Sequence, residues 1–570
     1  MTDRTSGNWR SNLPEGTPLW AGRRAHWAAL GLTPEDMTKP KIAIVNSSSK
    51  LAICFSHLDE VVAEVAQVIR DAGAVPFEVR TTAPSDFMTS AAKGGAYILP
   101  ARDLISFDIE AQVEGALLDG MICLASCDKT APGQLMAAAR LNIPTILVSG
   151  GYQASGEWKG KHIDIEDVFL HSTDVAAGRL SVDELGQMAD RAIRSPGVCA
   201  GMGTANSMHI VAEALGMMLP GHAPVRANSE KMMTNARAAA ARIVELVHQD
   251  IRPRDILTEA AFENAVKVTL AISGSINCVK HLQAVANDAG VALQIGPMFR
   301  KYGAQAPMLT DVRPNGETLT ETFEDAGGGA GIMRQLASVL RLDARSVDGR
   351  SIGEIVAALP DPDADVIRSI DNPLSARPAL TYVAGTLLPG GGIIRMGAVQ
   401  MRTTRHEGPA RLFHSRDEAV SAINADVVQP GEVVVLRGLG VIGGPGMALT
   451  SAVVFALKSK GLIDDVAVIT EGQVSGLVNQ GLVVGEASPE ASAGGPIALL
   501  KDGDVILIDA IEGVVDMQVP AEELARRAQA GEMFRLTDTA KGYLGVYRST
   551  VRPVHEGATL DRTTDPARGA

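Results

Sequence analysis

The sequence predicts an α/β region followed by a β-rich region, and three observations lead to this prediction. Strand-like and helix-like apolar patterns alternate at intervals of about 20 residues near the start of the chain. From about residue 379, short β-like runs separated by glycine turns replace this rhythm. The chain has 570 residues, which is too long for one ordinary core. A proline-rich stretch, residues 360–378, is a plausible linker, and we expect domains at 1–375 and 376–570.

The elements of the first region follow from local patterns. Residues 41–45 (KIAIV) are a predicted strand, and the polar loop at 46–55 contains Cys54. Apolar residues recur at helical spacing over 58–72, and Gly73 follows the end of this helix. The remaining elements are strands at 76–79, 121–124 and 145–148, and helices over 102–117 and from about 132. Ligands of parallel sheets bind at loops beyond the carboxyl ends of strands, where both Cys54 and Cys127 are expected.

The second region contains mostly short β-like runs. These are residues 380–383, 392–395, 432–436, 466–469, 497–500, 505–508 and 514–517. One helix is expected near 447–460. The uncharged stretch 438–457 is about as long as a membrane span, but its five glycines and one proline indicate a glycine loop that leads into a buried helix.

Composition narrows the class of protein. Hydrophobic residues make up 46% and charged residues 21%, which is typical of a globular chain. The net charge of −14 argues against nucleic acid or an anionic membrane as a partner. The N-terminal residues have no apolar core of a secretory signal, and five cysteines do not suggest a disulfide framework. We therefore expect a cytoplasmic protein.

A dense set of functional groups occurs at Cys127, Asp128 and Lys129, in the loop after a predicted strand. This tripeptide alone is equally consistent with a buried cysteine beside a solvated ion pair. Cys54 and Cys199 favour a functional role, because three loop cysteines suit an iron–sulfur cluster better than a four-ligand zinc site. Three thiolates leave one iron without a protein ligand, and such an iron can act as a Lewis acid on a hydroxyl.

The two other cysteines, Cys123 and Cys278, are expected to be packed core residues. Cys123 lies on the apolar strand at 121–124, and Cys278 lies in the segment SGSINCVKHL.

Four long segments resemble one enzyme family. They are ILPARDLISFDIE (98–110), MICLASCDKTAPGQLMAAARLNIPTILVSGG (121–151), PGVCAGMGTANSMHIVAEALGMMLPG (196–221) and SPEASAGGPIALLKDGD (488–504). The family includes dihydroxy-acid dehydratase, 6-phosphogluconate dehydratase and sugar-acid dehydratases, and the chain is most similar to the dihydroxy-acid branch. The resemblance runs from about residue 41 to the C-terminus. It implies an α/β N-terminal region, a β-barrel-like C-terminal domain and a site between them.

The resemblance also implies roles for particular residues. The implied cluster ligands are Cys54, Cys127 and Cys199. The implied Mg²⁺ ligands are Asp86, Asp128 and Lys129, the lysine as its carbamate. Ser475, in TEGQVSG, matches the serine that acts as the base. The three matching cysteines favour a [2Fe–2S] cluster, as in the branch that this chain is most similar to.

The chain departs from the family pattern in the C-terminal half of the implied site. Leu449 stands where the family has a glutamate ligand of Mg²⁺. Residues 471–473 read Glu-Gly-Gln in place of Asp-Gly-Arg, and the threonine after the serine is missing. Glu486 and Ala487 replace the usual histidine before Ser-Pro-Glu-Ala. The implied cluster ligands are unaffected by these changes.

The sequence therefore predicts a hydro-lyase that removes water from a 2,3-dihydroxy carboxylic acid to give a 2-keto acid. Two alternatives stay open: a sugar-acid dehydratase of the same family, and a cluster-binding paralogue with lost or altered catalysis. We expect a small hydroxy-acid substrate, no nucleic-acid or membrane partner, and a homodimer or homotetramer.

Overall fold

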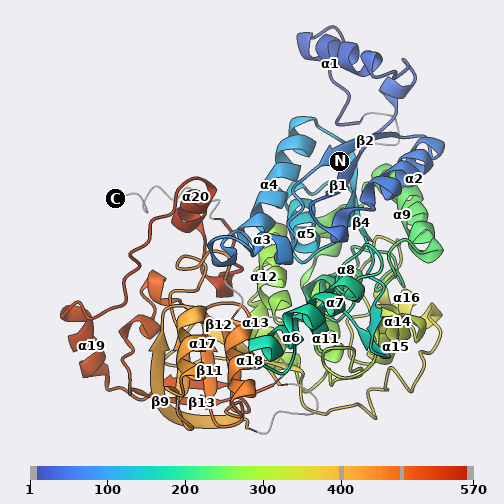
Figure 1. Ribbon diagram of the computed structural model, residues 1–570. Helices are drawn as coiled ribbons and strands as arrows, with labels where there is room; N and C mark the ends of the chain where they lie inside the picture. Colours follow the sequence, from blue (N-terminus) through green and yellow to red (C-terminus); the bar gives the residue numbers. More distant parts are fainter. Residues whose placement is uncertain (1–8, 177, 397–402, 448–449, 475–479, 561–570) are drawn as a thin grey trace.

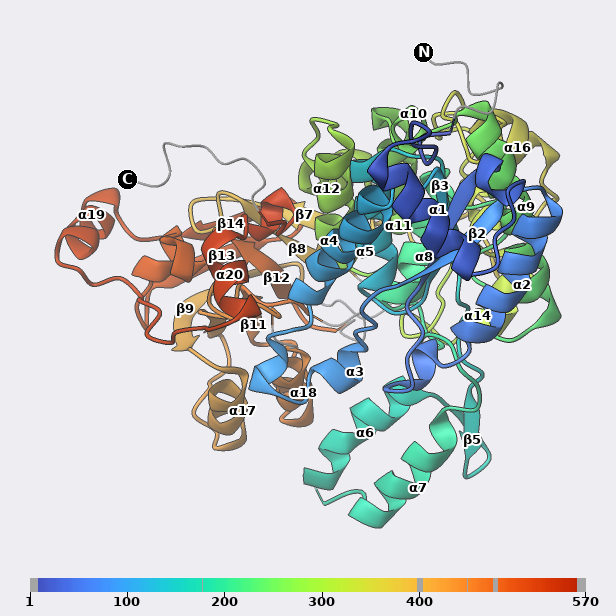
Figure 2. The same ribbon diagram turned by 90° about the horizontal axis from the view of Figure 1, so that it is seen from above.

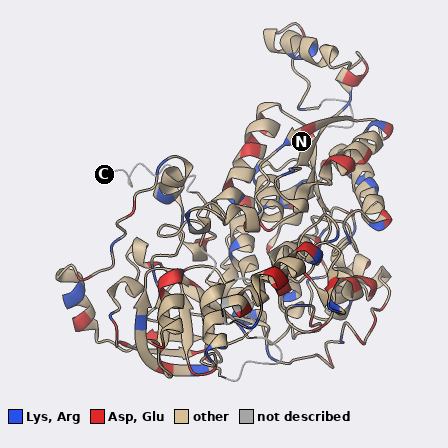
Figure 3. Cartoon of the chain, in the orientation of Figure 1, with Lys and Arg blue, Asp and Glu red and all other residues tan. Residues whose placement is uncertain are grey.

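The computed structural model describes residues 9–176, 178–396, 403–447, 450–474 and 480–560 (Figure 1). An N-terminal α/β region and a C-terminal region built on a mixed sheet lie side by side, as both ribbon views show (Figures 1 and 2). In Figure 3, acidic and basic residues are interspersed over both regions. No helix in the described part of the chain combines the length and the apolar character that a membrane span requires.

A four-stranded parallel sheet organises the N-terminal region. Its strands, in spatial order, are β2 (Val75–Arg80), β1 (Lys41–Asn46), β3 (Gly120–Ala125) and β4 (Thr145–Ser149). Strands β1, β3 and β4 are buried along their whole length, which explains their continuous apolar runs. The predicted parallel α/β arrangement is confirmed.

Helices cover both faces of this sheet. Helices α2 (Leu58–Asp71) and α9 (Glu230–Gln249) pack together on one face, and α4 (Pro100–Gly115) and α5 (Thr130–Leu141) pack together on the other (Figures 1 and 2). Helix α12 (Asn277–Ala289) lies against α5 and extends towards the C-terminal region.

Sequence patterns made no prediction for the helical segment from α6 (Ile165–Ala176) to α16 (Ile352–Ala358). Helices α8 (Thr204–Ala214) and α11 (Glu259–Ala271) in this segment are buried almost all round. A helix that is buried on every side has no polar face, so it lacks the periodicity that reveals a surface helix.

An eight-stranded mixed sheet forms the C-terminal region. Its order is β14 (Val514–Met517), β13 (Val505–Asp509), β9 (Arg405–Phe413), β10 (Val433–Leu436), β11 (Ala467–Thr470), β12 (Val483–Ser488), β8 (Gly391–Arg395) and β7 (Leu380–Val383). Strands β9 to β12 are parallel to one another, and antiparallel strands flank them on both sides. A bridge between Ala384, just after β7, and Val514 of β14 brings the two edges together. The sheet is therefore nearly closed into a barrel-like shape, as expected.

The two faces of this sheet belong to different cores. Val433 and Val435 of β10 pack inside the barrel-like sheet. Val434 and Leu436 of the same strand point outward, into the large core that is continuous with the N-terminal region. This alternation follows from the period of two in a β-strand. It joins the two regions through a common hydrophobic core.

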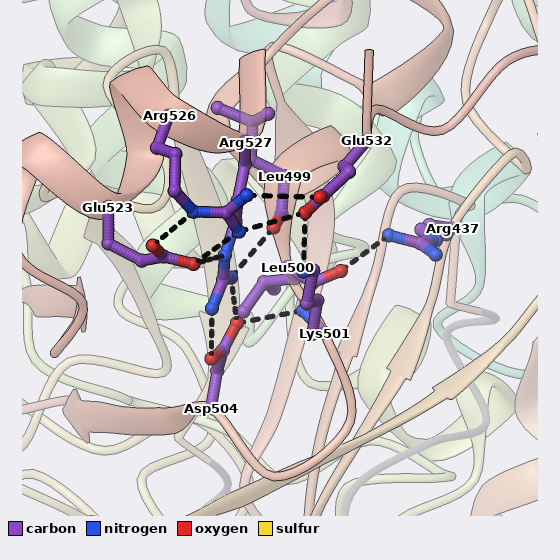
Figure 4. A network of polar contacts seen from close by, with 9 residues as sticks. All are labelled: Arg437, Leu499, Leu500, Lys501, Asp504, Glu523, Arg526, Arg527 and Glu532. Carbon is purple, nitrogen blue, oxygen red and sulfur yellow. Dashed lines mark hydrogen bonds and ion pairs between the residues drawn. The ribbon is translucent and has the colours of Figure 1, made fainter. Parts of the chain in front are cut away.

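One predicted strand in this region is wrong. Residues 497–500 are not extended, because Pro496–Leu499 is a 3-10 helix that begins at a proline. Arg437 and Arg527 donate hydrogen bonds to the carbonyls of Leu500 and Leu499, and Arg527 is held by Asp504 and Glu523 (Figure 4). These carbonyls are therefore bound by side chains and not by a neighbouring strand. Strands β9 and β12 were not predicted, and helix α18 (Ser451–Ser459) is shorter than the helix expected near 447–460.

A buried ion pair also connects the two regions. Lys280 of α12 pairs with Glu486 of β12, and the two side chains are 0% and 4% exposed. Burial lowers the pKa of Lys280 to about 8, although the charge of Glu486 acts in the opposite direction. Glu486 is the residue that replaces the family histidine, so this substitution places a carboxylate opposite a buried ammonium group. An ion pair of this kind stabilises the contact only while both partners are present.

We expect the Lys280→Met variant to be less stable than the native protein by about 3–5 kcal/mol, because it leaves the carboxylate of Glu486 buried and unpaired. The double variant Lys280→Met/Glu486→Gln should recover part of this loss. Lys460→Met is the matched control, because the pair of Lys460 with Asp426 lies at the surface and should contribute at most about 1 kcal/mol. Thermal unfolding measures the stability of all three variants. A Lys280→Met variant that is as stable as the native protein would contradict a buried ion pair.

Candidate active site

Three loops converge at the carboxyl edge of the parallel sheet. Cys54 lies in a 3-10 turn (Ile53–Phe55) after β1, and Asp86 begins the short helix α3 (Asp86–Thr89) after β2. Cys127, Asp128 and Lys129 follow β3 and lead directly into α5. Because β2, β1 and β3 are neighbours, their loops meet at one edge, as the sequence predicted.

A cavity brings most of the predicted residues together. Five of them line it directly: Cys54, Asp86, Cys127, Asp128 and Cys199. Lys129 is fully buried and reaches the same group through Asp86, with 3.1 Å between Nζ and Oδ2. Ser475 and Leu449 lie outside the described residues. Gln473, two positions before Ser475, lines this cavity and so brings the C-terminal region to it.

The thiols interact with one another. A hydrogen bond with Cys127 lowers the pKa of Cys54, and the same bond together with burial raises the pKa of Cys127. The pKa of Cys199 is raised by burial and by the nearby charge of Cys54. Negative charges on neighbouring thiols repel one another, and a positive centre between them would relieve this repulsion. The cavity therefore brings together three thiols that could serve as soft metal ligands.

A second group of polar atoms consists of the carboxylate oxygens around Lys129. Burial and the charge of Asp86 raise the pKa of Asp128 to about 6. Burial acts to lower the pKa of Lys129, but the charges of Asp86 and Asp128 outweigh this effect and raise it. Oδ1 of Asp86 is buried and has no hydrogen-bond partner among the described residues. Two carboxylates with a free buried oxygen suit a hard cation.

The remaining cysteines are core residues, as predicted. Cys123 faces the core from β3, and Cys278 is buried in α12. Neither residue lines the cysteine cavity. Burial alone raises the pKa of Cys123, and mainly burial raises the pKa of Cys278 to about 12.

Two buried glutamates hold the glycine-rich loop at residues 438–447. Glu471 accepts hydrogen bonds from the backbone N–H groups of Gly438, Leu439 and Ala491. Glu490 accepts from Ile442 and Gly443. The carboxylate of Glu471 is therefore already engaged by the backbone and is a poor replacement for the glutamate that Leu449 displaces.

Sequence reasoning missed Glu166, near the start of α6, which lines the cysteine cavity. It is 4% exposed, and its Oε2 has no hydrogen-bond partner in the described part of the chain. Burial, and next the charge of Asp164, raise the pKa of Glu166 to about 8. A glutamate in the first turn of an amphipathic helix gives no signal in a single sequence, because such positions usually face solvent.

A second group of potential metal ligands lies nearby but already has a cation. Atoms of His162, Asp164 and Asp167 lie within 4.8 Å of one another. The guanidinium of Arg313 donates to Nδ1 of His162 at 2.9 Å and to Asp167 at 2.7 Å. Arg313 thus supplies the positive charge that a metal ion would bring.

A larger cavity, of about 600 Å³, lies between the two regions. Lys280 and Glu486 line it, together with Tyr382 and His555. Lys280 also donates a hydrogen bond to Asn277, which lines the cysteine cavity. The buried ion pair therefore stands between the two cavities. No thiol lines the larger cavity, so the size of a cavity does not identify the candidate active site.

Comparisons with known proteins agree with this geometry. A family model described as the dihydroxy-acid/6-phosphogluconate dehydratase N-terminal domain matches residues 39–355, and its C-terminal counterpart matches residues 365–558. The chain belongs to this dehydratase family. It is accordingly a dehydratase enzyme, and the segments that carry the resemblance include the loops of Cys127 and Cys199.

Similar proteins span nearly the whole chain. The chain is 40% identical over 543 residues to a dihydroxy-acid dehydratase of Caldicellulosiruptor saccharolyticus, covering 95% of this chain and 98% of that one. It is 39% identical to a dihydroxy-acid dehydratase of Methanococcoides burtonii, with 94% and 97% covered. It is 38% identical to dihydroxy-acid dehydratase 1 of Methanosarcina acetivorans, with 97% and 100% covered.

The buried carboxyl of Glu166 should affect the pH dependence of stability. Its pKa is about 8 in the folded chain, against an ordinary value of 4.5. Between these values the unfolded chain has lost this proton while the folded chain retains it, so rising pH favours unfolding. We expect the melting temperature of the native dehydratase to fall more steeply over this range than that of the Glu166→Gln variant. Parallel curves would mean that Glu166 is charged in the folded protein at neutral pH.

Proposed function

We propose that this dehydratase is a hydro-lyase that removes water from a 2,3-dihydroxy carboxylic acid and releases a 2-keto acid. The observation that carries the proposal is the cavity in which three thiols and two carboxylates converge beside Lys129. The names of its relatives, which are dihydroxy-acid dehydratases, support the same substrate class.

The residues present fit two inorganic cofactors. The thiols of Cys54, Cys127 and Cys199 would hold an iron–sulfur cluster, which we propose to be [2Fe–2S]. Asp86 and Asp128, with Lys129 as its carbamate, would hold Mg²⁺, and the unpartnered Oδ1 of Asp86 fits this role. When bound, these groups would supply Lewis acidity at the C3 hydroxyl and at the carboxylate end of the substrate.

The residues of the chain would position the substrate and remove the proton from C2. The loops of Cys54, Asp86 and Cys127 fix the position of the 2,3-diol, because they are anchored in the parallel sheet. We propose that Ser475 accepts the proton from C2. Hydroxide departs from C3 and takes up a proton to form water, and the enol that results tautomerises to the 2-keto acid. An isolated serine is too weak a base for this step, so the cationic surroundings are required to lower its pKa.

The oligomeric state, the location and the domain boundary remain predictions of the sequence. They are a homodimer or homotetramer, the cytoplasm, and a division after residue 375.

Formation of a 2-keto acid tests the proposed function. Anaerobically purified protein that shows visible cluster absorption should convert at least one member of a panel of 2,3-dihydroxy acids, measured as the hydrazone of the product. The Ser475→Ala variant is the control. It should keep the visible spectrum but lose about 10²–10⁴-fold in kcat, the usual contribution of a general base. A native protein with an intact spectrum and no product from the whole panel would favour a paralogue without catalysis.

A second experiment tests the cluster ligands. Serine in place of Cys54, Cys127 or Cys199 should each abolish most of the visible absorption, because each thiol lines the cavity. Serine in place of Cys123 or Cys278 is the matched control and should leave the absorption nearly intact, because neither thiol lines the cavity. Loss of the spectrum in Cys123→Ser with retention in Cys54→Ser would refute the assignment.

A further inference from the structure

A row of hydrogen bonds leads from the buried ion pair to the wall of the cysteine cavity. Lys280 of α12 donates to the carboxylate of Glu486 in β12 and, at 2.5 Å, to Oδ1 of Asn277. Nδ2 of Asn277 donates in turn to Oγ1 of Thr204, the first residue of α8, at 2.9 Å. Asn277 and Thr204 line the cysteine cavity, whereas Lys280 and Glu486 line the larger one. The proposed reaction assigns no role to these four side chains.

The ammonium group of Lys280 sets the direction of this row. An ammonium group can only donate, so the atom of Asn277 that faces it is the amide oxygen. The amide nitrogen therefore points at Thr204, whose hydroxyl oxygen accepts the hydrogen bond. The hydroxyl hydrogen of Thr204 then remains to be donated to another acceptor. Without the ammonium group the amide of Asn277 could turn over, and Thr204 would give its hydrogen to the amide oxygen instead.

The acceptor for this hydrogen in the cysteine cavity is the carboxylate of Asp128. Burial and the charge of Asp86 raise the pKa of Asp128 to about 6, and a hydrogen bond from the Thr204 side chain acts in the opposite direction. Oγ1 of Thr204 also lies 3.0 Å from Oγ of Ser275, which can donate to it. A donor stabilises the ionised form of a carboxyl group, and this is the form that binds a cation. The row therefore ends at one of the proposed Mg²⁺ ligands.

The whole row is shielded from solvent. Glu486, Lys280, Asn277 and Thr204 are all buried. Positions 277 and 280 lie on the same face of α12, which extends towards the C-terminal region in Figure 2, where β12 supplies the carboxylate. A buried network of this kind is well defined only when all of its members are satisfied. The contact between the two regions thus orients side chains at the cysteine cavity.

We propose that Lys280 is a positioning residue of the proposed cation site. Through Asn277 it directs the hydroxyl group of Thr204, which orients the carboxylate of Asp128 as a ligand. The inference rests on the proposed function, because the cation site is part of that proposal. Residues that hydrogen-bond a metal ligand typically change metal affinity by about 10–100-fold when they are altered. We expect an effect of this size although Lys280 itself does not line the cysteine cavity.

Calorimetric titration with Mg²⁺ tests this role without turnover. The cluster-containing protein is first freed of divalent cations by chelation and kept with bicarbonate, which supplies the carbamate of Lys129. The variant Lys280→Met/Glu486→Gln removes the donor and leaves no unpaired charge. It should bind Mg²⁺ about 10–100-fold more weakly than the native protein. In Lys280→Gln/Glu486→Gln the new amide can still donate to Asn277, so most of the affinity should return.

A second comparison tests whether Lys280 acts through Asn277. Asn277→Ala should weaken Mg²⁺ binding by a similar factor, since it breaks the same row. Its addition to Lys280→Met/Glu486→Gln should cause little further loss, because effects along one network are not additive. The matched control is Lys267→Met/Glu263→Gln, which neutralises another buried lysine pair, in α11. Neither of these residues lines the cysteine cavity or the larger one, so the affinity for Mg²⁺ should not change.

Three outcomes would overturn this inference and leave the proposed cation site standing. Equal affinity in the native protein and in Lys280→Met/Glu486→Gln would give Lys280 a structural role only. Equal losses in that variant and in Lys280→Gln/Glu486→Gln would mean that the donated hydrogen bond has no effect. Additive losses with Asn277→Ala would mean that Lys280 acts by another route. A native protein that binds no Mg²⁺ would instead overturn the cation site, and this inference with it.

Discussion

A fully buried lysine between two carboxylates is the interaction around which the site is arranged. Lys129 Nζ lies 3.1 Å from Asp86 and 3.9 Å from Asp128, and its side chain has no exposed surface. The unmodified ammonium of Lys129 is stable here only because opposite charges compensate it, so the loops that supply these carboxylates stay together. As the carbamate proposed above, Lys129 would be held beside them by the shared cation. The loops are the extensions of β2 and β3, and the loop of Cys54 after β1 lies between them. The thiols of Cys54 and Cys127 and these carboxylates are thus assembled by the same packing of parallel strands, whereas Cys199 reaches the cavity from the loop before α8.

The C-terminal region completes the site through buried charges as well. Glu471 and Glu490 bind the backbone of the glycine-rich loop at 438–447, and Lys280 pairs with Glu486 across the boundary between the regions. Hydrogen bonds from several backbone N–H groups hold a loop in one conformation more effectively than side-chain contacts, because they leave the backbone little freedom. Gln473, two residues after Glu471, lines the cysteine cavity.

Two of the residues that depart from the family pattern, Glu486 and Glu471, have defined partners in the structure. Glu486, in place of a histidine, has Lys280 as its partner, so the change is compensated within the chain. Glu471, in place of an aspartate, is engaged by the loop backbone. The carboxylate of Glu471 is therefore not free to take the place of the glutamate that the family pattern has at position 449. Glu166, which the sequence did not single out, also brings a carboxyl to the cysteine cavity.

The sequence by itself determined the parallel α/β arrangement and the loops that carry Cys54, Cys127 and Asp128. Strand and helix periodicity are local, and the residue after a buried parallel strand necessarily lies at the edge of the sheet. Only the tertiary structure placed Glu166 and Lys280, because their partners Gly201 and Glu486 lie far away in the chain. It also decided that residues 497–500 are not a strand, since the arginine side chains that bind their carbonyls come from distant segments. The behaviour of a buried charge depends on the residues around it, and those residues come together only when the chain folds.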